Sequence, residues 1–348
     1  MMLARAVYDG RGIQLLDTGT VLDARHLPVL ARLEVKDLLV HDSRVDDVVI
    51  EPLISEQVEA QAVRLLHRII DGNRDRRIEY IKLDMVQVSR IVKAMIQSLF
   101  SAFMGEINIE GSMSLGNYDY IHPVKVAGLA LLMGKEAGYS RSELVSLGTA
   151  AYLMNIGYTL IPTNILATQD PLAEATPKQI QRHVEIGNQI ILQTEDHDTK
   201  VAEAILRHHE RWNGNGYPNR LKGKAICPFA RIIAIADTYH ALVSLRSNQQ
   251  PYSPPEAAEY IAAYSGELFD PELVQMFFRK IPFYPRGISV RLNTGEIGIV
   301  TNPNVGYIGR PMVRVCYGKD GIDVETPYDL CLSELKHQDK VIAEIVDY

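Results

Sequence analysis

Residues 208 to 218 read His208-His209-Glu210-Arg211-Trp212-Asn213-Gly214-Asn215-Gly216-Tyr217-Pro218. The two adjacent imidazoles follow an apolar stretch, and a second apolar run, residues 231 to 236, ends in Asp237. Histidine is the commonest metal ligand, and a buried carboxylate must be paired, hydrogen-bonded or bound to a metal. Glycine permits and proline fixes unusual backbone angles, so the residues between the two runs form a tight turn. The sequence therefore places candidate metal ligands at the ends of two apolar segments.

The composition is that of an ordinary globular protein. Hydrophobic residues make up 47% and charged residues 23% of the 348 residues, enough chain for two or three domains. The net charge of -7 argues against binding to nucleic-acid polymers or to anionic membranes, because such binding requires a basic surface. The three cysteines are widely spaced and are expected to be reduced thiols.

Neither a membrane span nor an export signal is expected. No apolar run approaches the ~18 residues that a membrane-spanning helix requires. The first residues soon reach the polar pair Asp9-Gly10, so they lack the apolar core of a signal peptide. These features predict a cytoplasmic protein.

Hydrophobic periodicity divides the chain into four predicted parts. Apolar residues recur every three or four positions through the middle of the chain, which indicates helices, and they alternate near the C-terminus, which indicates strands. The predicted parts are a small α+β module (residues 1–50), a helical connector (51–108), a helical domain (109–282) and a β-rich appendage (283–348). The predicted fold class is therefore mainly α.

Shorter elements are predicted within these parts. Ser140 and Glu143 have the spacing of a capping box, which predicts a helix directly after Ser140. The other predicted elements are a hairpin over residues 6–16, a helix over 26–33, and strands over 37–40, 289–292, 296–300 and 313–317. The strands of the two ends belong to the α+β module and to the β-rich appendage.

Several ordered motifs resemble the HD-GYP family, which comprises bacterial metal-dependent phosphodiesterases and receptors of cyclic di-GMP. The resemblance covers about residues 110 to 282 and includes the turn between Glu210 and Pro218. It implies an HD-domain-like helical bundle. It also implies metal-ligand positions at His122, His183, His208, His209 and Asp237. Helical spacing separately turns His183 toward an apolar face, because isoleucines lie three residues before and after it.

The His-Asp pair that gives the family its name is replaced. Family members carry Leu-Leu-His-Asp-Ile-Gly-Lys at the end of a helix, where this chain has Tyr152-Leu153-Met154-Asn155-Ile156-Gly157-Tyr158. Met154 stands for the histidine, Asn155 for the aspartate and Tyr158 for the lysine. An uncharged amide cannot offset the repulsion between two divalent ions, and a thioether is a soft ligand suited to Cu(I). A two-metal hydrolytic centre is therefore not expected.

Two states of the remaining ligand positions stay open. In the first the site holds no metal and the imidazoles form hydrogen bonds with Asp237, Asn155 and water. In the second the histidines bind one divalent ion, Fe, Mn or Zn. His240 stands where the family has an aspartate, and it is expected to lie on the helix surface rather than to act as a replacement ligand.

The resemblance also implies nucleotide contacts. Arg211 and Arg246 would form forked hydrogen bonds with phosphate, and Tyr217 would stack on a base. Two cations of the family are missing, because Tyr158 and Gln249 stand at positions where basic residues are usual. Fewer cations weaken the hold on phosphate groups.

Three functions remain open on the sequence. The first is a catalytically degenerate signalling protein that binds cyclic di-GMP, or a partner such as a diguanylate-cyclase domain, through the former active-site face. The second is a residual cyclic di-GMP phosphodiesterase that works with one ion. The third is a structural adaptor whose function lies outside the helical domain.

Overall fold

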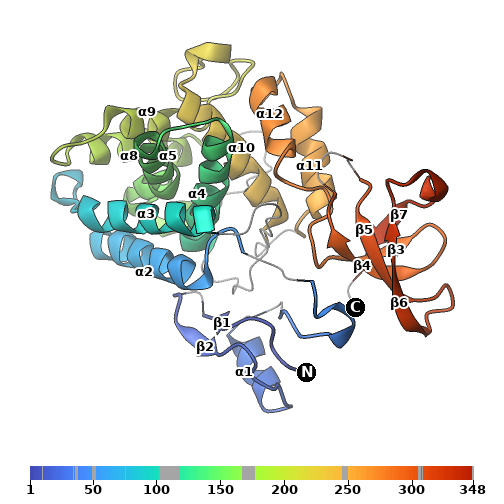
Figure 1. Ribbon diagram of the computed structural model, residues 1–348. Helices are drawn as coiled ribbons and strands as arrows, with labels where there is room; N and C mark the ends of the chain where they lie inside the picture. Colours follow the sequence, from blue (N-terminus) through green and yellow to red (C-terminus); the bar gives the residue numbers. More distant parts are fainter. Residues whose placement is uncertain are drawn as a thin grey trace.

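A helical bundle carries a small module on one side and a β-sheet on another (Figure 1). The computed structural model describes residues 1–9, 11–33, 35, 38–48, 52–74, 76–101, 118–166, 177–244, 250–304, 307 and 309–346. Within that part of the chain, no helix is both long and apolar enough to cross a membrane.

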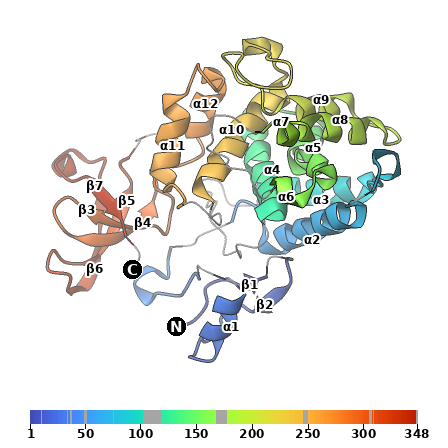
Figure 2. The ribbon, with the colours of Figure 1, turned by 180° about the vertical axis from the view of Figure 1, so that it is seen from behind.

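The helices of the bundle follow one another between residues 56 and 278. They are α2 (Glu56–Asn73), α3 (Met85–Ser101), α4 (Tyr118–Glu136), α5 (Arg141–Leu153), α6 (Thr163–Leu166), α7 (Lys178–Gln181), α8 (His183–Leu192), α9 (Thr199–Arg207), α10 (Pro228–Val243), α11 (Pro254–Ala263) and α12 (Pro271–Phe278). The predicted capping box is confirmed, since Ser140 accepts a hydrogen bond from the Glu143 amide and the Glu143 carboxylate accepts one from the Ser140 amide. Figure 2 shows α7 beside α8, and α6 in turn contacts α7.

Helix α4 is the centre of the bundle. Thirteen of its nineteen residues are buried, so it is apolar on all sides, as a helix surrounded by protein must be. Helix α5 packs closely against α4 because each of the two helices has a glycine where it contacts the other. A Cβ on Gly134 would lie 2.6 Å from Leu147, and a Cβ on Gly148 would lie 2.9 Å from Leu131.

The described helices of the bundle share one hydrophobic core. That core begins at Leu53 and includes the inner faces of α2 and α3 together with those of α4, α5, α9, α10 and α12. The helices predicted as a connector therefore pack into the same core as the predicted helical domain. The four-part division of the chain itself stays a prediction.

The C-terminal strands form an antiparallel sheet with the order β6-β5-β4-β3-β7. Its strands are β3 (Ser289–Leu292), β4 (Ile297–Asn302), β5 (Met312–Tyr317), β6 (Asp323–Cys331) and β7 (Ile342–Ile345). Alternate residues point into a separate small core that includes Val290, Val300 and Val313. The first three strands confirm the prediction, whereas β6 and β7 were not resolved as strands from the sequence.

The N-terminal module has the predicted hairpin and helix. Strands β1 (Val7–Tyr8) and β2 (Gln14–Leu16) pair antiparallel, and α1 (His26–Arg32) follows. Of the strand predicted over 37–40, Asp37 lies outside the described residues, and Val40 forms only an isolated bridge with Leu3.

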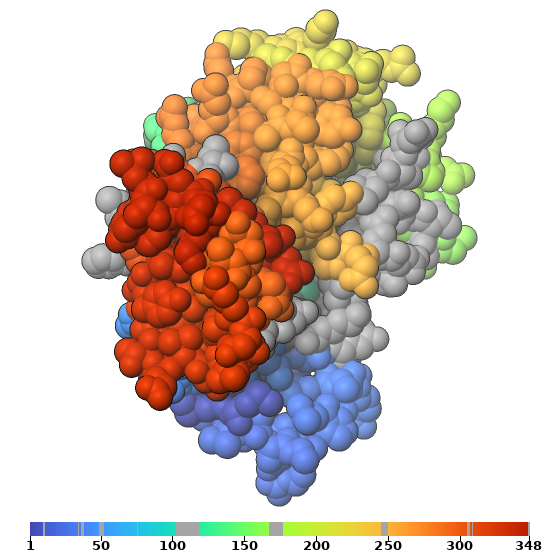
Figure 3. Space-filling view, turned by 90° about the vertical axis from the view of Figure 1, so that its right-hand side faces the viewer, coloured from blue at the N-terminus to red at the C-terminus, as the bar shows by residue number. Residues whose placement is uncertain are grey.

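The two ends of the chain meet in space (Figure 3). Arg314 of β5 donates to the Asp47 carboxylate at 3.0 Å, and Arg44 donates to Asp323 at 2.7 Å. These ion pairs are partly exposed, so each contributes little to stability on its own.

Candidate metal and ligand site

Three histidines meet where α8 begins and α9 ends. His183 is the first residue of α8, and His208 and His209 directly follow α9. One nitrogen from each ring lies within 4.8 Å of the others, which is the spacing of a set that holds one ion. His183 and His208 are fully buried.

Hydrogen bonds fix the tautomers of two of these rings. The Nδ1 of His183 donates to the Ile180 carbonyl at 2.7 Å, and the Nδ1 of His208 donates to the Ile205 carbonyl at 2.7 Å. In a neutral ring the Nε2 then carries a lone pair and no proton. These two Nε2 atoms lie 3.4 Å apart, so two acceptors face each other. A cation bound by both resolves this repulsion, and a backbone bond at Nδ1 is typical of metal-ligating histidine.

Burial keeps these rings neutral. Desolvation, with the nearby His208 ring, lowers the pKa of His183 to about 3. The same cause lowers the pKa of His208 and holds the pKa of His209 well below its usual value. Neutral imidazole is the form that binds a metal, so this donor set fits one divalent ion of the kind that imidazole prefers.

A second polar cluster lies between α4 and α10. His122 Nε2 donates to the Asp237 carboxylate at 2.7 Å, and both side chains are mostly buried. The Nδ1 atom of His122 lies 2.8 Å from the Tyr118 hydroxyl and 2.8 Å from the Nδ1 of His240. Burial opposes ionisation of Asp237, but its hydrogen bond from His122 outweighs burial and holds the pKa of Asp237 well below its usual range.

Asp237 joins the two clusters. Its second carboxylate oxygen lies 3.9 Å from the Nδ1 of His209. The five predicted ligand positions are therefore near one another, but they divide into a three-histidine set and a bonded His122–Asp237 pair. Within the described part of the chain, only the three-histidine set has the spacing of a metal site.

The prediction that His240 lies on the helix surface is wrong. His240 is 6% exposed and contacts His122, so it does not lie on the helix surface. It stands three residues after Asp237 on α10, and residues three apart share a helix face. Tyr118 was also missed, although it stands four residues before His122 on α4. The helical spacing of His240 from Asp237, and of Tyr118 from His122, could have indicated both contacts from the sequence.

Of the three replaced family positions, Tyr158 contacts the three-histidine set. Met154 is fully buried in the bundle core, and Asn155 is half-buried directly before the 3₁₀ helix η4 (Ile156–Leu160). The Tyr158 ring centre lies 4.4 Å from that of His183. Gly157 is required by close packing, because a Cβ there would lie 2.0 Å from the His183 carbonyl oxygen.

The turn after His209 is held by its own side chains. Glu210 is buried and accepts hydrogen bonds from the backbone amides of Asn219 and Leu221, at 2.7 and 2.9 Å. A Cβ on Gly216 would lie 2.4 Å from the His209 carbonyl oxygen, so only glycine fits. The Tyr217 ring stacks on His209 with centres 4.8 Å apart.

Arg211 brings an unsatisfied donor to this turn. Its Nη1 atom is buried and has no hydrogen-bond partner among the described residues. Its charge also contributes to the lowered pKa values of His208 and His209, which places it near the three-histidine set. Arg246, the other predicted phosphate contact, lies outside the described residues.

Comparison with known proteins assigns the family. The family model described as "HD domain" matches residues 93–273, more than half of the chain. This chain belongs to the HD-domain family. The HD-domain match includes all five predicted ligand positions and the turn motif, and the resemblance to HD-GYP proteins is confirmed.

Curated relatives of this HD-domain chain are cyclic-dinucleotide phosphodiesterases. It is 30% identical over 200 residues to a cyclic di-GMP phosphodiesterase of Pseudomonas aeruginosa, covering 58% of this chain and 48% of the relative. It is 35% identical over 156 residues to a cyclic di-GMP phosphodiesterase response regulator of Xanthomonas campestris (44% and 41%). It is 31% identical over 222 residues to a 3'3'-cGAMP-specific phosphodiesterase of Vibrio cholerae (64% and 41%). The matched segment spans less than half of each relative.

Among solved structures, an HD-GYP-type protein of Bdellovibrio bacteriovorus aligns with a TM-score of 0.47 at 17% identity. The alignment covers 76% of this chain and 89% of that one. The family assignment itself rests on the HD-domain match.

Proposed function

We propose that this chain is a catalytically degenerate member of its family. In this proposal it binds cyclic di-GMP, or a partner protein such as a diguanylate-cyclase domain, at the face formed by the three histidines and the turn from Glu210 to Pro218. The sequence similarity to cyclic-dinucleotide phosphodiesterases supports the ligand class. The resemblance implies metal ligands at positions that Met154 and Asn155 now occupy.

One observation carries the proposal: the described residues offer a single ion-sized set of ligands. Hydrolysis with two metals needs an anionic oxygen between the ions. Asn155 is neutral, Met154 packs in the core, and the remaining carboxylate, Asp237, is bonded to His122. Three neutral imidazoles can hold one ion, which would supply Lewis-acid contact to a phosphate oxygen.

The chain's own residues would hold the nucleotide. Arg211 has a buried donor without a protein partner, and a phosphate oxygen would satisfy it. Tyr217 lies next to His209 at the same surface, where an aromatic ring can stack on a base. Both contacts bind ligand without contributing to bond cleavage.

Calorimetry combined with product analysis tests this function. The chain is expected to bind cyclic di-GMP without releasing linear dinucleotide in the presence of Mn²⁺ or Fe²⁺. Arg211→Gln removes one charge-assisted hydrogen bond and should weaken binding roughly tenfold. The exposed Arg279→Gln serves as the charge-matched control. Absence of heat at high micromolar ligand would leave only the protein-partner form, and turnover by pure protein would refute degeneracy.

The three-histidine set favours one second candidate, a phosphodiesterase that works with a single ion. Its ligands are the neutral imidazoles of His183, His208 and His209. Under this candidate His208→Gln abolishes both metal content and hydrolysis, whereas the exposed His197→Gln changes neither. Purified protein that holds no transition metal and shows no hydrolysis after Mn²⁺ or Fe²⁺ addition would exclude it.

A further inference from the structure

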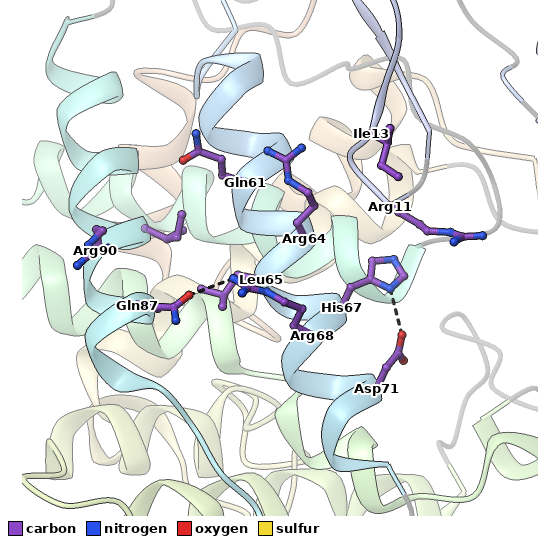
Figure 4. A pocket seen from close by; sticks show the side chains of 11 residues that line it. Arg11, Ile13, Gln61, Arg64, Leu65, His67, Arg68, Asp71, Gln87 and Arg90 are labelled. Carbon is purple, nitrogen blue, oxygen red and sulfur yellow. Dashed lines mark hydrogen bonds and ion pairs between the residues drawn. The ribbon is translucent and has the colours of Figure 1, made fainter.

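A basic groove lies on the outer side of α2 and α3, under the turn of the N-terminal hairpin (Figure 4). Its volume is about 650 Å³, within the range of small-molecule sites. The residues that line it are Arg11, Ile13, Gln61, Arg64, Leu65, His67, Arg68, Asp71, Gln87, Arg90 and Ile91. Neither the proposed ligand-binding face nor the three-histidine set contributes to this lining.

The charge of the groove is opposite to that of the chain. The whole chain has 43 acidic and 36 basic side chains, but the groove has four arginines and one carboxylate, Asp71. Asp71 already accepts a hydrogen bond from the Tyr120 hydroxyl at 2.8 Å and contacts His67 at 3.3 Å.

The hydrogen bonds of the groove arginines within the described chain go to uncharged oxygens, although Arg90 also acts electrostatically on Asp84 of the segment before α3. Arg64 donates to the Gly12 carbonyl at 3.0 Å, and Arg68 donates to the Gln87 amide oxygen at 3.0 Å. Both acceptors are uncharged. In the described chain, neither these two arginines nor Arg11 and Arg90 form an ion pair with a carboxylate. Arg64 and Arg68 are also one turn apart on α2, where like charges destabilise a helix.

The groove also has apolar walls. Leu65 is buried at its floor, Ile91 is half-buried, and Ile13 is 51% exposed at the hairpin. Guanidinium groups recognise phosphate through forked hydrogen bonds and stack on planar rings, whereas the aliphatic side chains provide contact for an apolar group. This combination suits a ligand that is anionic at one end and apolar at the other.

We infer that this groove binds a phosphorylated small molecule that carries a planar or apolar group, the chemistry of a nucleotide. Arg64 and Arg68 bind its phosphates from α2, and Arg11 and Arg90 add charge from the hairpin and α3. Leu65 and Ile91 contact its apolar part.

Calorimetry of the full chain with ADP, inorganic pyrophosphate and adenosine tests the inference. ADP should bind more tightly than pyrophosphate, because only ADP fills the apolar part, and adenosine should bind weakest. The double substitution Arg64→Gln with Arg68→Gln removes two phosphate contacts and should weaken ADP binding at least about tenfold. Arg25→Gln with Arg32→Gln removes the same charge from exposed positions directly before and at the end of α1 and should leave binding within about twofold.

Three outcomes would overturn the inference. The first is the absence of heat with both ADP and pyrophosphate, and the second is an equal loss of ADP affinity in the two double variants. The third is that the chain binds polyglutamate but not ADP. Circular dichroism checks that the groove variant folds, and Arg90→Gln on α3 supplies a second, single-site variant. Arg211→Gln distinguishes this groove from the site of the proposed function. If Arg211→Gln abolishes ADP binding and the groove variants retain it, ADP binds at the face formed by the three histidines and the turn from Glu210 to Pro218.

Discussion

At the residue scale, the histidines differ in what they can bind. His183 and His208 use Nδ1 for backbone carbonyls and so direct Nε2 lone pairs at each other. His122 instead donates its Nε2 proton to Asp237. The first arrangement leaves room for one ion, and the second satisfies a buried carboxylate without a metal.

The residue-scale prediction is that restoring the family's pair increases metal binding. Met154→His with Asn155→Asp adds an imidazole and an anionic oxygen directly before η4, whose Gly157 packs against His183. Metal content, measured by mass spectrometry on purified protein, should rise from at most one ion per chain toward two. The single change Met154→Leu keeps the buried position apolar and serves as control. An unchanged metal content in the double variant would mean that the second ion is blocked by other parts of the site.

At the element scale, the site depends on how closely η4 and α8 approach. Gly157 of η4 lies against the first residue of α8, and Gly187 of α8 faces back toward η4. This contact fixes where His183 stands relative to the end of α9. The glycine pair is therefore a structural requirement of the three-histidine set, independent of whether the chain hydrolyses anything.

The element-scale prediction concerns this contact. In Gly157→Ala the new Cβ would lie 2.0 Å from the His183 carbonyl oxygen, so α8 must move. The free energy of unfolding should fall by about 2–3 kcal/mol, the cost of overpacking, and metal content should fall with it. Gly72→Ala in α2 meets no atom within 4 Å and should be neutral or stabilising by up to about 1 kcal/mol. Urea unfolding measures the free energy of unfolding of both variants. Equal free energies for Gly157→Ala and Gly72→Ala would contradict the packing argument.

At the scale of the whole molecule, polar pairs link segments that are distant in the sequence. Lys340 binds Glu296 at 2.9 Å, which ties the segment before β7 to the start of β4. Glu296 is only 6% exposed. Burial opposes its ionisation, but hydrogen bonds from Lys340 and Thr294 outweigh burial and lower the pKa of Glu296 to about 2.

The whole-molecule prediction is a dependence of stability on pH. The pKa of Glu296 is lower in the folded than in the unfolded chain, so its stabilisation is complete above about pH 4.5 and is lost as the pH falls toward 2. Glu296→Gln should lower the free energy of unfolding at pH 7 by about 1–3 kcal/mol. The dependence of this free energy on pH should also become flatter between about pH 4.5 and about pH 2. Circular dichroism during urea unfolding measures this. The exposed Glu325→Gln is the control, and a wild-type slope in Glu296→Gln would refute the assignment.

The resemblance to the family supplied the candidate ligands His183, His208 and His209. The sequence by itself determined the helical class, the capping box of α5 and three strands of the sheet. Local rules suffice for these, because helix and strand periods depend on neighbours along the chain. Only the tertiary structure decided which histidines share one set, that His240 turns inward to His122, and that four arginines from a hairpin and two helices line one groove. Those relations depend on how separate elements pack, and the spacing of residues within one element does not specify its partner.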